Sequence, residues 1–239
     1  MRPDPRHLGQ TLAGWTVPPR PGPAAMEGRH ARLERLDPDR HAAALFEANR
    51  TDDRIWDYLG YGPFADLASY RAWVGSMAPL DDPCFYAVID RATGRPGGVA
   101  AFLRITPDMG SIEVGHICLS PALQHRTAAT EAIALMMGWA FAAGYRRFEW
   151  KCDALNLPSR RAAARLGFSY EGTFRQHMIV KGRNRDTAWF SVIDGEWPAL
   201  SAAFDRWLAP ENFDADGRQR RSLSELTRDL RAATDPAIE

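Results

Sequence analysis

Residues 111–131 read SIEVGHICLSPALQHRTAATE, and the architecture follows from this stretch. A β-type run over 111–120 passes through a short basic loop, residues 124–130, into the first turn of an apolar helix that reaches Gly144. The first N–H groups of a helix have no acceptor within it, and the helix dipole is positive at that end. The loop therefore predicts a helix start that suits a phosphate group.

The segments after this loop indicate a helix packed on a sheet. The helix is apolar over most of its circumference, for example at Ile133, Met136 and Phe141, so it needs packing partners on more than one side. Residues 147–153 then alternate charged and apolar side chains, which is typical of a strand, and a short helix follows that ends at Gly167. This order predicts an α/β fold.

Further strands and helices are predicted on both sides of this unit from period-two and helical spacings. In chain order they are a strand over 30–36, helices over 38–48 and 67–77 with an aromatic loop at 55–64 between them, strands over 85–89 and 97–105, one bent strand or two over 168–180, a turn over 181–185, a strand over 187–193, a helix over 197–208 and a capping box at 222–225.

Composition divides the chain into three parts. Residues 1–25 are rich in Pro, Gly and Arg, and the run PPRPGP at 18–23 is excluded from helices and central strands, so we expect an irregular arm. Residues 26–194 carry the strand and helix pattern, and we expect residues 195–239 to form a helical extension. The sequence contains no secretory apolar segment and no run of transmembrane length, so we expect a cytoplasmic protein.

Charge and cysteine usage narrow the class of ligand. The whole chain has a formal net charge of zero, which argues against a nucleic-acid partner, but residues 124–185 carry a net charge of +7 and residues 186–239 one of −5. A basic middle suits a small polyanion. The three cysteines have the spacing of neither a zinc site nor a disulfide framework, so we expect reduced core residues and no metal.

Five motifs in order resemble the GCN5-related N-acetyltransferases, and among them the ribosomal-protein N-terminal (RimJ/RimL-like) branch. The resemblance covers residues 28–193 and implies a mixed, mostly antiparallel sheet, splayed between its fourth and fifth strands, with acetyl-CoA in the split. The motifs are EVGH at 113–116, QHRTAATEA at 124–132, NLPS at 156–159, LGF at 166–168 with EG at 171–172, and GR at 182–183 followed by Asp186.

The resemblance also implies which residues bind coenzyme A. The backbone of the loop would hold the pyrophosphate, with Arg126 adding charge, and a strand N–H near Cys118 or Leu119 would polarise the thioester carbonyl. The family has a glycine where this chain has Thr127, so we expect a negative φ at that residue. The implied cofactor-binding residues are Cys118, Leu119, Gln124, His125, Arg126, Thr127, Ala128, Ala129, Thr130, Asn156 and Ser159.

Two residues are candidates for proton transfer. Glu113 is the candidate general base, because an amine arrives as an ammonium ion and must lose a proton before it attacks. Ser159 is placed to donate a proton to the leaving thiolate. Strand alternation would put His116 on the face opposite Glu113, which favours a structural role for His116. We expect neither Cys118 nor Cys152 to carry an acyl group, because nothing beside them lowers a thiol pKa.

The acceptor side is the least determined part of the sequence. Aromatic residues of the 55–64 loop predict a pocket wall formed by Trp56, Tyr58 and Tyr61, with His177 as a further contact, although a packed loop explains the same residues. The expected reaction is direct transfer of an acetyl group to a protein N-terminus, a lysine or a small amine. The alternatives are a larger acyl donor such as succinyl-CoA, and a non-catalytic acyl-CoA sensor. Homodimerisation is left open.

Overall fold

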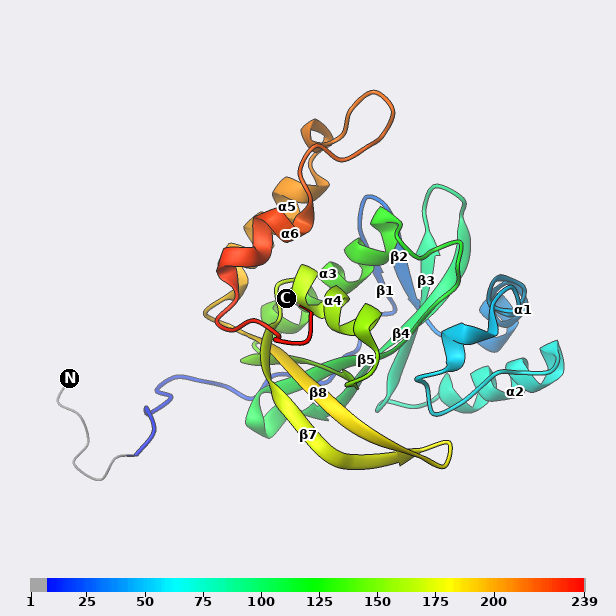
Figure 1. Ribbon diagram of the computed structural model, residues 1–239, viewed down its shortest axis with the longest axis horizontal. Coiled ribbons are helices and arrows are strands. Elements are labelled where there is room, and N and C mark those ends of the chain that lie inside the picture. The colour runs from blue at the N-terminus through cyan, green and yellow to red at the C-terminus, as the bar shows by residue number, and fades with distance from the viewer. Residues whose placement is uncertain (1–7, 239) are drawn as a thin grey trace.

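The computed structural model describes residues 8–238, and within them eight strands form one sheet in the order β1-β2-β3-β4-β5-β6-β8-β7 (Figure 1). All neighbours pair antiparallel except β5 and β6, which are parallel. The mixed α/β fold with a mostly antiparallel sheet is therefore confirmed. The strands are β1 (Ala25–Glu27), β2 (Ala31–Arg35), β3 (Cys84–Asp90), β4 (Arg95–Thr106), β5 (Ser111–Leu119), β6 (Arg147–Asp153), β7 (Ser169–Val180) and β8 (Arg183–Ile193).

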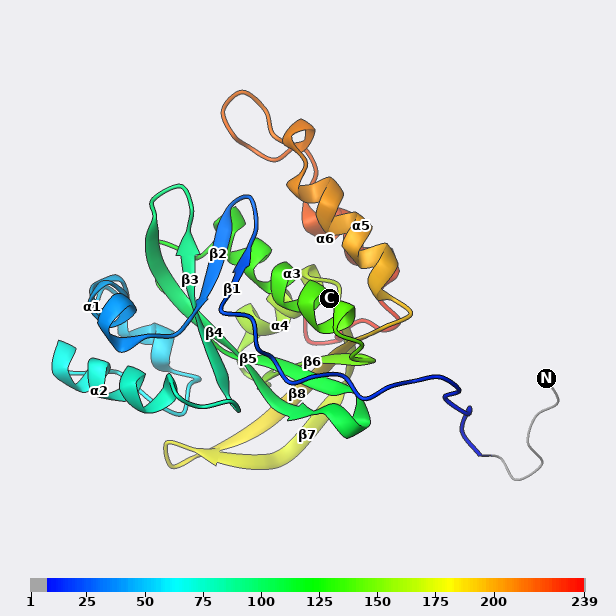
Figure 2. The ribbon, with the colours of Figure 1, turned by 180° about the vertical axis from the view of Figure 1, so that it is seen from behind.

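Helices cover both faces of the sheet, so its two faces have separate cores (Figures 1 and 2). On one face α1 and α2 pack together beside β4, and their apolar residues include Leu45, Tyr70 and Val74. On the other face α3 and α4 pack over the middle strands. The helices are α1 (Pro38–Asn49), α2 (Leu67–Met77), α3 (Thr127–Ala142), α4 (Leu157–Arg165), α5 (Trp197–Leu208) and α6 (Leu223–Thr227), with short 3-10 turns at η1 (Asp53–Trp56), η2 (Pro107–Met109), η3 (Pro210–Asn212) and η4 (Arg228–Leu230).

The structure corrects three details of the predicted elements. A three-residue strand, β1, precedes the first predicted strand, so the predicted fourth and fifth strands are β5 and β6. The segment predicted as one bent strand or two over 168–180 is a single strand from Ser169, whose register shifts between Phe174 and Met178. The turn predicted over 181–185 is shorter, because β8 already begins at Arg183. Strand periodicity alone contained no signal for any of these.

A bulge in β5 overturns the predicted faces of that strand. The register with β4 shifts between Val99 and Ala101, and His116 takes a left-handed φ of 51°. Ile112 packs in the core on the α3 side, whereas Cys118 packs in the core on the α1–α2 side. The prediction that His116 lies opposite Glu113 is therefore wrong: beyond the bulge, His116 is on the Glu113 face.

The carboxylate of Glu131 joins α3 to the turn between β1 and β2. It is buried and accepts hydrogen bonds from the backbone N–H groups of Arg29, His30 and Ala31, at 2.8, 2.5 and 2.6 Å. Residue 28 must be glycine, because a Cβ there would lie 2.4 Å from the Glu131 Cδ. This contact fixes the first turns of α3 against the edge of the sheet.

The C-terminal segment shares the core on the α3 side. Leu200, Phe204 and Leu223 are buried in it beside α3 and α4. The tail after α6 returns to α4, where the buried Asp235 carboxylate accepts two hydrogen bonds from the Arg160 guanidinium, one of them 2.6 Å from Nε. Figure 1 shows the last described part of the tail beside α3 and α4.

The N-terminal arm is described from residue 8, and residues 1–7 of the predicted arm lie outside the described residues. Its proline carbonyls accept hydrogen bonds from tyrosine hydroxyls: Tyr145 donates to Pro19 and Tyr86 to Pro23, both at 2.9 Å. No helix over residues 8–238 is long and apolar enough to cross a bilayer.

Candidate active site in the split sheet

The sheet splits between β5 and β6. Their parallel pairing covers only residues 111–114 with 147–150, and its last pair is Val114 with Trp150. Beyond that pair β5 continues to Leu119 and β6 to Asp153 without pairing to each other. Their facing backbone groups lie where an extended ligand can reach them. The end of β5 leads toward α3 and the end of β6 toward α4, so both helix starts border the split (Figure 1).

The start of α3 meets the requirements of an anion site. The side chain of its N-cap residue, Arg126, accepts no hydrogen bond from the first N–H groups of the helix. These N–H groups therefore lack the usual capping acceptor. Residues 124–126 are exposed, and His125 turns the loop with a φ of 60°. Thr127 begins the helix and is not among the residues with positive φ, so threonine strains nothing in place of the family's glycine.

The other predicted loop residues differ in what they can reach. The Gln124 amide donates to the Leu119 carbonyl at 3.0 Å, which ties the loop to the end of β5. Ala128 is buried in the core and Ala129 is half-buried. The hydroxyl of Thr130 is buried and accepts from Arg165 at 2.8 Å, so it faces α4 and only its backbone is left for a ligand.

The start of α4 uses both residues of the Asn-x-x-Ser motif in local contacts. Asn156 is the N-cap, and its side-chain oxygen accepts from the Ser159 N–H at 3.1 Å. The Ser159 hydroxyl accepts from Trp150 Nε1 at 3.0 Å and has one proton of its own to donate, with the Cys152 thiol as a neighbouring group. Trp150 belongs to the last β5–β6 pair, so Ser159 is held at the vertex of the split.

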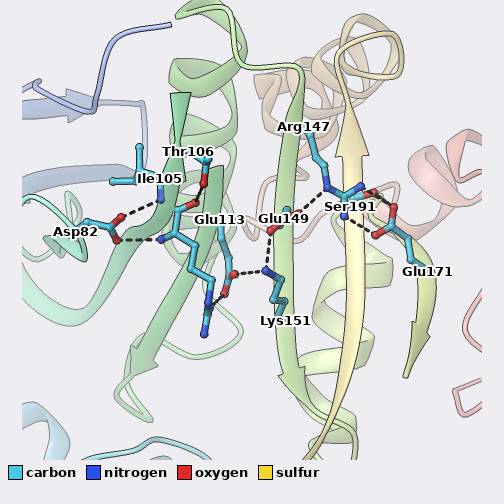
Figure 3. Close-up of polar contacts among 10 residues, drawn as sticks. Asp82, Ile105, Thr106, Glu113, Arg147, Glu149, Lys151, Glu171 and Ser191 are labelled. Carbon is cyan, nitrogen blue, oxygen red and sulfur yellow. Dashed lines mark hydrogen bonds and ion pairs between the residues drawn. The ribbon is translucent and has the colours of Figure 1, made fainter. Parts of the chain in front are cut away.

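Glu113 lies at the same vertex within a row of six alternating charges, which we call the charge ladder (Figure 3). The ladder takes its members from β4, β5, β6 and β7 and passes over β8, on the face opposite α3 and α4. Each carboxylate in it contacts a cation. In spatial order its members are Arg104, Glu113, Lys151, Glu149, Arg147 and Glu171.

Contacts along the ladder are short. Arg104 Nη1 lies 2.6 Å from Glu113 Oε1, and Lys151 Nζ lies 3.0 Å from Glu113 Oε2 and 2.8 Å from Glu149 Oε2. Glu113 Oε2 is buried and faces the Lys151 ammonium. Asp82 accepts from the Arg104 N–H at 2.9 Å, which holds that arginine in its left-handed conformation (Figure 3).

The three carboxyl groups of the ladder differ in the direction of their pKa shifts. Desolvation raises the pKa of Glu113 above its ordinary value, although Lys151 and Arg104 oppose the shift. Burial acts against ionisation of Glu149 too, but there the bonds from Lys151 and Arg147 prevail and its pKa is lowered. Arg147 also lowers the pKa of Glu171. Glu113 is therefore the carboxylate of the ladder best suited to accept a proton.

The predicted acceptor residues are placed in different environments. Trp56 is 3% exposed and packs in the α1–α2 core, so its ring offers almost no surface to an acceptor. Tyr61 stacks on His116, and both rings lie on the Glu113 face. Tyr58 is exposed, and its hydroxyl donates to the Leu155 carbonyl at 3.2 Å, which bridges the 53–64 segment to the loop after β6.

His177 lies farther along, at the register shift of β7. Its Nδ1 is 3.0 Å from the Thr187 hydroxyl, and its ring packs against Phe174 and Trp189. A hollow of about 600 Å³ is lined here by Phe174, Arg175, Gln176 and His177. Trp189, which packs against Phe174 and His177, also covers Lys151, with Nζ 3.8 Å from the ring centroid, so this ring connects two lining residues to the charge ladder.

The cysteines match the sequence-based expectation. Cys84, Cys118 and Cys152 are free and buried. Burial raises the pKa of Cys118 to about 12 and that of Cys152 to about 11, so neither thiol is activated for acyl transfer. Among residues 8–238 no group of His, Cys, Asp and Glu side chains has the arrangement of a metal site.

The split sheet, with a helix start on each side of it, is the feature by which this class of protein is described. Comparison with known proteins gives the family. The model of the acetyltransferase (GNAT) domain matches residues 30–169, more than half of the chain, and the protein belongs to that family. A GCN5-related N-acetyltransferase from Brucella melitensis is 49% identical, and the match covers 91% of this chain and all of that one with a TM-score of 0.88.

More distant relatives agree on the domain. An uncharacterised N-acetyltransferase, p20, from Bacillus licheniformis is 25% identical over 151 residues, which is 62% of this chain and 84% of the relative. The solved RimL ribosomal L7/L12 α-N-protein acetyltransferase is 22% identical with a TM-score of 0.61, over 71% of this chain and 93% of that one. At that identity the likeness extends to the fold alone.

His116 makes the folded protein sensitive to acid. Burial, followed by the charges of Arg104 and Arg185, lowers its pKa to about 4, against about 6.5 in an unfolded chain. Below pH 6.5 the imidazole of His116 is protonated in the unfolded state but stays neutral in the folded state. The free energy of unfolding therefore falls from pH 6.5 toward pH 4, by at most about 1.4 kcal/mol per pH unit.

Urea unfolding at pH 7.5 and pH 5 tests this. Between the two pH values, His116→Phe should lose less free energy of unfolding than the wild type. Equal losses in both proteins would contradict this prediction.

Proposed function

We propose that the protein transfers an acetyl group from acetyl-CoA to a primary amine by direct attack, with no covalent enzyme intermediate. One observation carries the proposal: an uncapped helix start and a proton-accepting carboxylate, Glu113, flank the same split in the sheet. Membership of the acetyltransferase family supports it.

The position of each residue along the split determines which part of acetyl-CoA it contacts. The N–H groups at the start of α3, with Arg126 beside them, hold the pyrophosphate, and the free edges of β5 and β6 border the acyl-carrying arm. Backbone N–H groups after the β5 bulge, at Cys118 or Leu119, polarise the carbonyl. Bound acetyl-CoA supplies the activated thioester.

Proton transfer balances across the vertex of the split. The incoming ammonium gives one proton to Glu113 and becomes a nucleophilic amine. As the carbon–nitrogen bond forms and the carbon–sulfur bond breaks, Ser159 donates its proton to the thiolate and is reprotonated by the second proton that the nitrogen loses. The enzyme then holds one extra proton, on Glu113, which it returns to water. A thiol of pKa near about 8.5 is a good leaving group, so the contribution of Ser159 is the smaller one.

The acceptor enters from the Glu113 face, past Tyr58 and Tyr61 and the hollow at His177. We keep Tyr58, Tyr61 and His177 in the proposed acceptor site and omit Trp56, because its ring is buried. A protein N-terminus, as in the RimJ/RimL-like branch, a lysine and a small amine are the acceptor classes to compare. A non-catalytic sensor remains the alternative, with Thr127 in place of the family's glycine as its support; Thr127 begins α3 and is not among the residues with positive φ.

Thiol release from acetyl-CoA, measured against a panel of peptides, polyamines and aminoglycosides, tests the function. At least one amine should release free thiol at a rate that depends on both enzyme and amine concentration. Succinyl-CoA in a parallel series distinguishes a larger acyl donor. Calorimetric binding of coenzyme A with no thiol release across the whole panel would refute the transferase and favour a sensor.

Replacing Glu113 by glutamine should lower the rate at neutral pH by about 10²–10⁴-fold, the usual contribution of a general base. The loss should shrink as pH rises, because more of the amine is then already deprotonated. Ser159→Ala should cost less than Glu113→Gln at every pH. An unchanged rate from pH 6 to pH 9 would remove Glu113 from the mechanism.

A further inference from the structure

Lys151 occupies a singular place in the split. It lies on β6 directly after Trp150, the last residue of β6 that pairs with β5, and its side chain is 6% exposed. The ammonium lies over the Trp189 ring. Two carboxylates, those of Glu113 and Glu149, pair with it (Figure 3). These contacts fix the position of the Lys151 ammonium and keep it from solvent.

The strand register explains why a cation is needed there. Glu113 on β5 lies directly opposite Glu149 on β6, and two like charges at facing positions destabilise a strand pair. Lys151 is one step along the same face and neutralises both carboxylates at once. Each carboxylate also has a second cation: Arg147 for Glu149 and Arg104 for Glu113. Arg104 is half-exposed, so Lys151 is the buried cation of Glu113.

The surroundings of Glu113 otherwise disfavour its charge. Its side chain is 2% exposed, and the aromatic layer of the α1–α2 face lies on its side of the sheet. The charged and titratable groups that face it are Arg104 from β4, His116 from β5, Lys151 and Glu149 from β6, and Tyr61 from the loop before α2. His116 is neutral at physiological pH and Tyr61 is protonated, so the two cations alone support the carboxylate.

We propose that Lys151 is a positioning residue for acyl transfer, whose ammonium keeps the Glu113 carboxylate ionised and fixed at the vertex of the split. The assignment rests on the proposed function, because Glu113 must accept the proton of the incoming amine. The charge of Lys151 sets the pH at which Glu113 becomes available as a base.

The test is the pH dependence of kcat/KM in Lys151→Met, which keeps the length of the side chain and removes its charge. Loss of a cation within 4 Å moves a carboxyl pKa by about 1–3 units, so the acid limb of the profile should move up by at least one pH unit. On that limb the rate should fall about tenfold or more, and it should recover toward the wild-type value at high pH. Lys151→Arg should keep the acid limb close to that of the wild type.

Arg147→Met is the matched control, because Arg147 belongs to the ladder and contacts Glu149 and Glu171 but not Glu113. Its acid limb should stay in place. A purely structural role of the ladder would lower the rate equally at all pH values in both variants. That result, or an unmoved acid limb in folded Lys151→Met, would overturn the proposal.

A second readout does not depend on turnover. The carboxyl ¹³C resonance of Glu113, assigned by its loss in Glu113→Gln, should titrate at higher pH in Lys151→Met than in the wild type. If the wild type binds coenzyme A but acylates no amine, the proposed function fails, while this titration still decides whether Lys151 controls Glu113. A Glu113 titration that is the same in both proteins refutes the control itself.

Discussion

Glu131→Ala is expected to lower the free energy of unfolding by about 3–5 kcal/mol, because hydrogen bonds to a charged acceptor are worth about 1.5–3 kcal/mol each and do not add fully. The buried carboxylate of Glu131 receives three backbone N–H groups from residues 29–31. The substitution leaves these three N–H groups without an acceptor in a turn that packs against α3. Water can reach them only if the turn moves away from α3. Urea unfolding monitored by far-UV circular dichroism measures the change.

Two variants show whether the charge and the position carry this effect. Glu131→Gln keeps one acceptor oxygen and should cost less than alanine. Glu47→Ala removes an exposed glutamate of α1 that pairs with Arg50, and it should stay within about 0.5 kcal/mol of the wild type. Similar losses in Glu131→Ala and Glu47→Ala would show that the turn at 28–31 does not depend on this carboxylate.

Asp235→Ala is expected to lower the free energy of unfolding by about 3–5 kcal/mol, the usual cost of leaving one partner of a buried ion pair alone. Asp235 is 1% exposed and Arg160 is 6% exposed, so the guanidinium that remains cannot be hydrated in place. Arg160 also donates to the Ala154 carbonyl at 2.8 Å, in the loop before Asn156. The variant should therefore raise KM for acetyl-CoA in addition to losing stability.

The double variant Arg160→Met with Asp235→Leu separates the buried charge from the packing. A hydrophobic pair of similar volume often replaces a buried ion pair at little cost, so the double variant should recover most of the stability lost in Asp235→Ala. Asp229→Ala, in an exposed part of the same tail, is the surface control. A double variant less stable than Asp235→Ala would show that the pair contributes more than mutual neutralisation.

Local signals in the sequence were sufficient for most elements. The helix predicted over 67–77 has those bounds, and the strand over 147–153 and the capping box at 222–225 are also confirmed. Each of these depends on spacing and capping within a dozen residues. The order of the motifs around residues 113–159 was enough to predict the split sheet because the family pattern spans both of its edges.

Contacts across strands and single backbone conformations were beyond the sequence. The bulge at His116 reverses side-chain faces through one residue in a left-handed conformation, and histidine gives no warning of it. The alternation of Arg147, Glu149 and Lys151 predicted a strand, but only the register with β5 shows that Glu149 faces Glu113. Trp56 was ambiguous, because an aromatic residue in a loop packs a core as readily as it lines a pocket.

The hydroxyl of Thr130, bound by Arg165, has a thermodynamic consequence for the end of the chain. The Arg165 carbonyl accepts from the Thr227 hydroxyl of α6 at 3.0 Å, so α3, α4 and α6 form one continuous set of contacts. Coupling between two sites is reciprocal: if a ligand at the start of α3 strengthens the attachment of the C-terminal segment, that attachment strengthens ligand binding by the same factor. Resistance of residues 222–238 to carboxypeptidase would then report occupancy of the split, at a distance from any reacting atom.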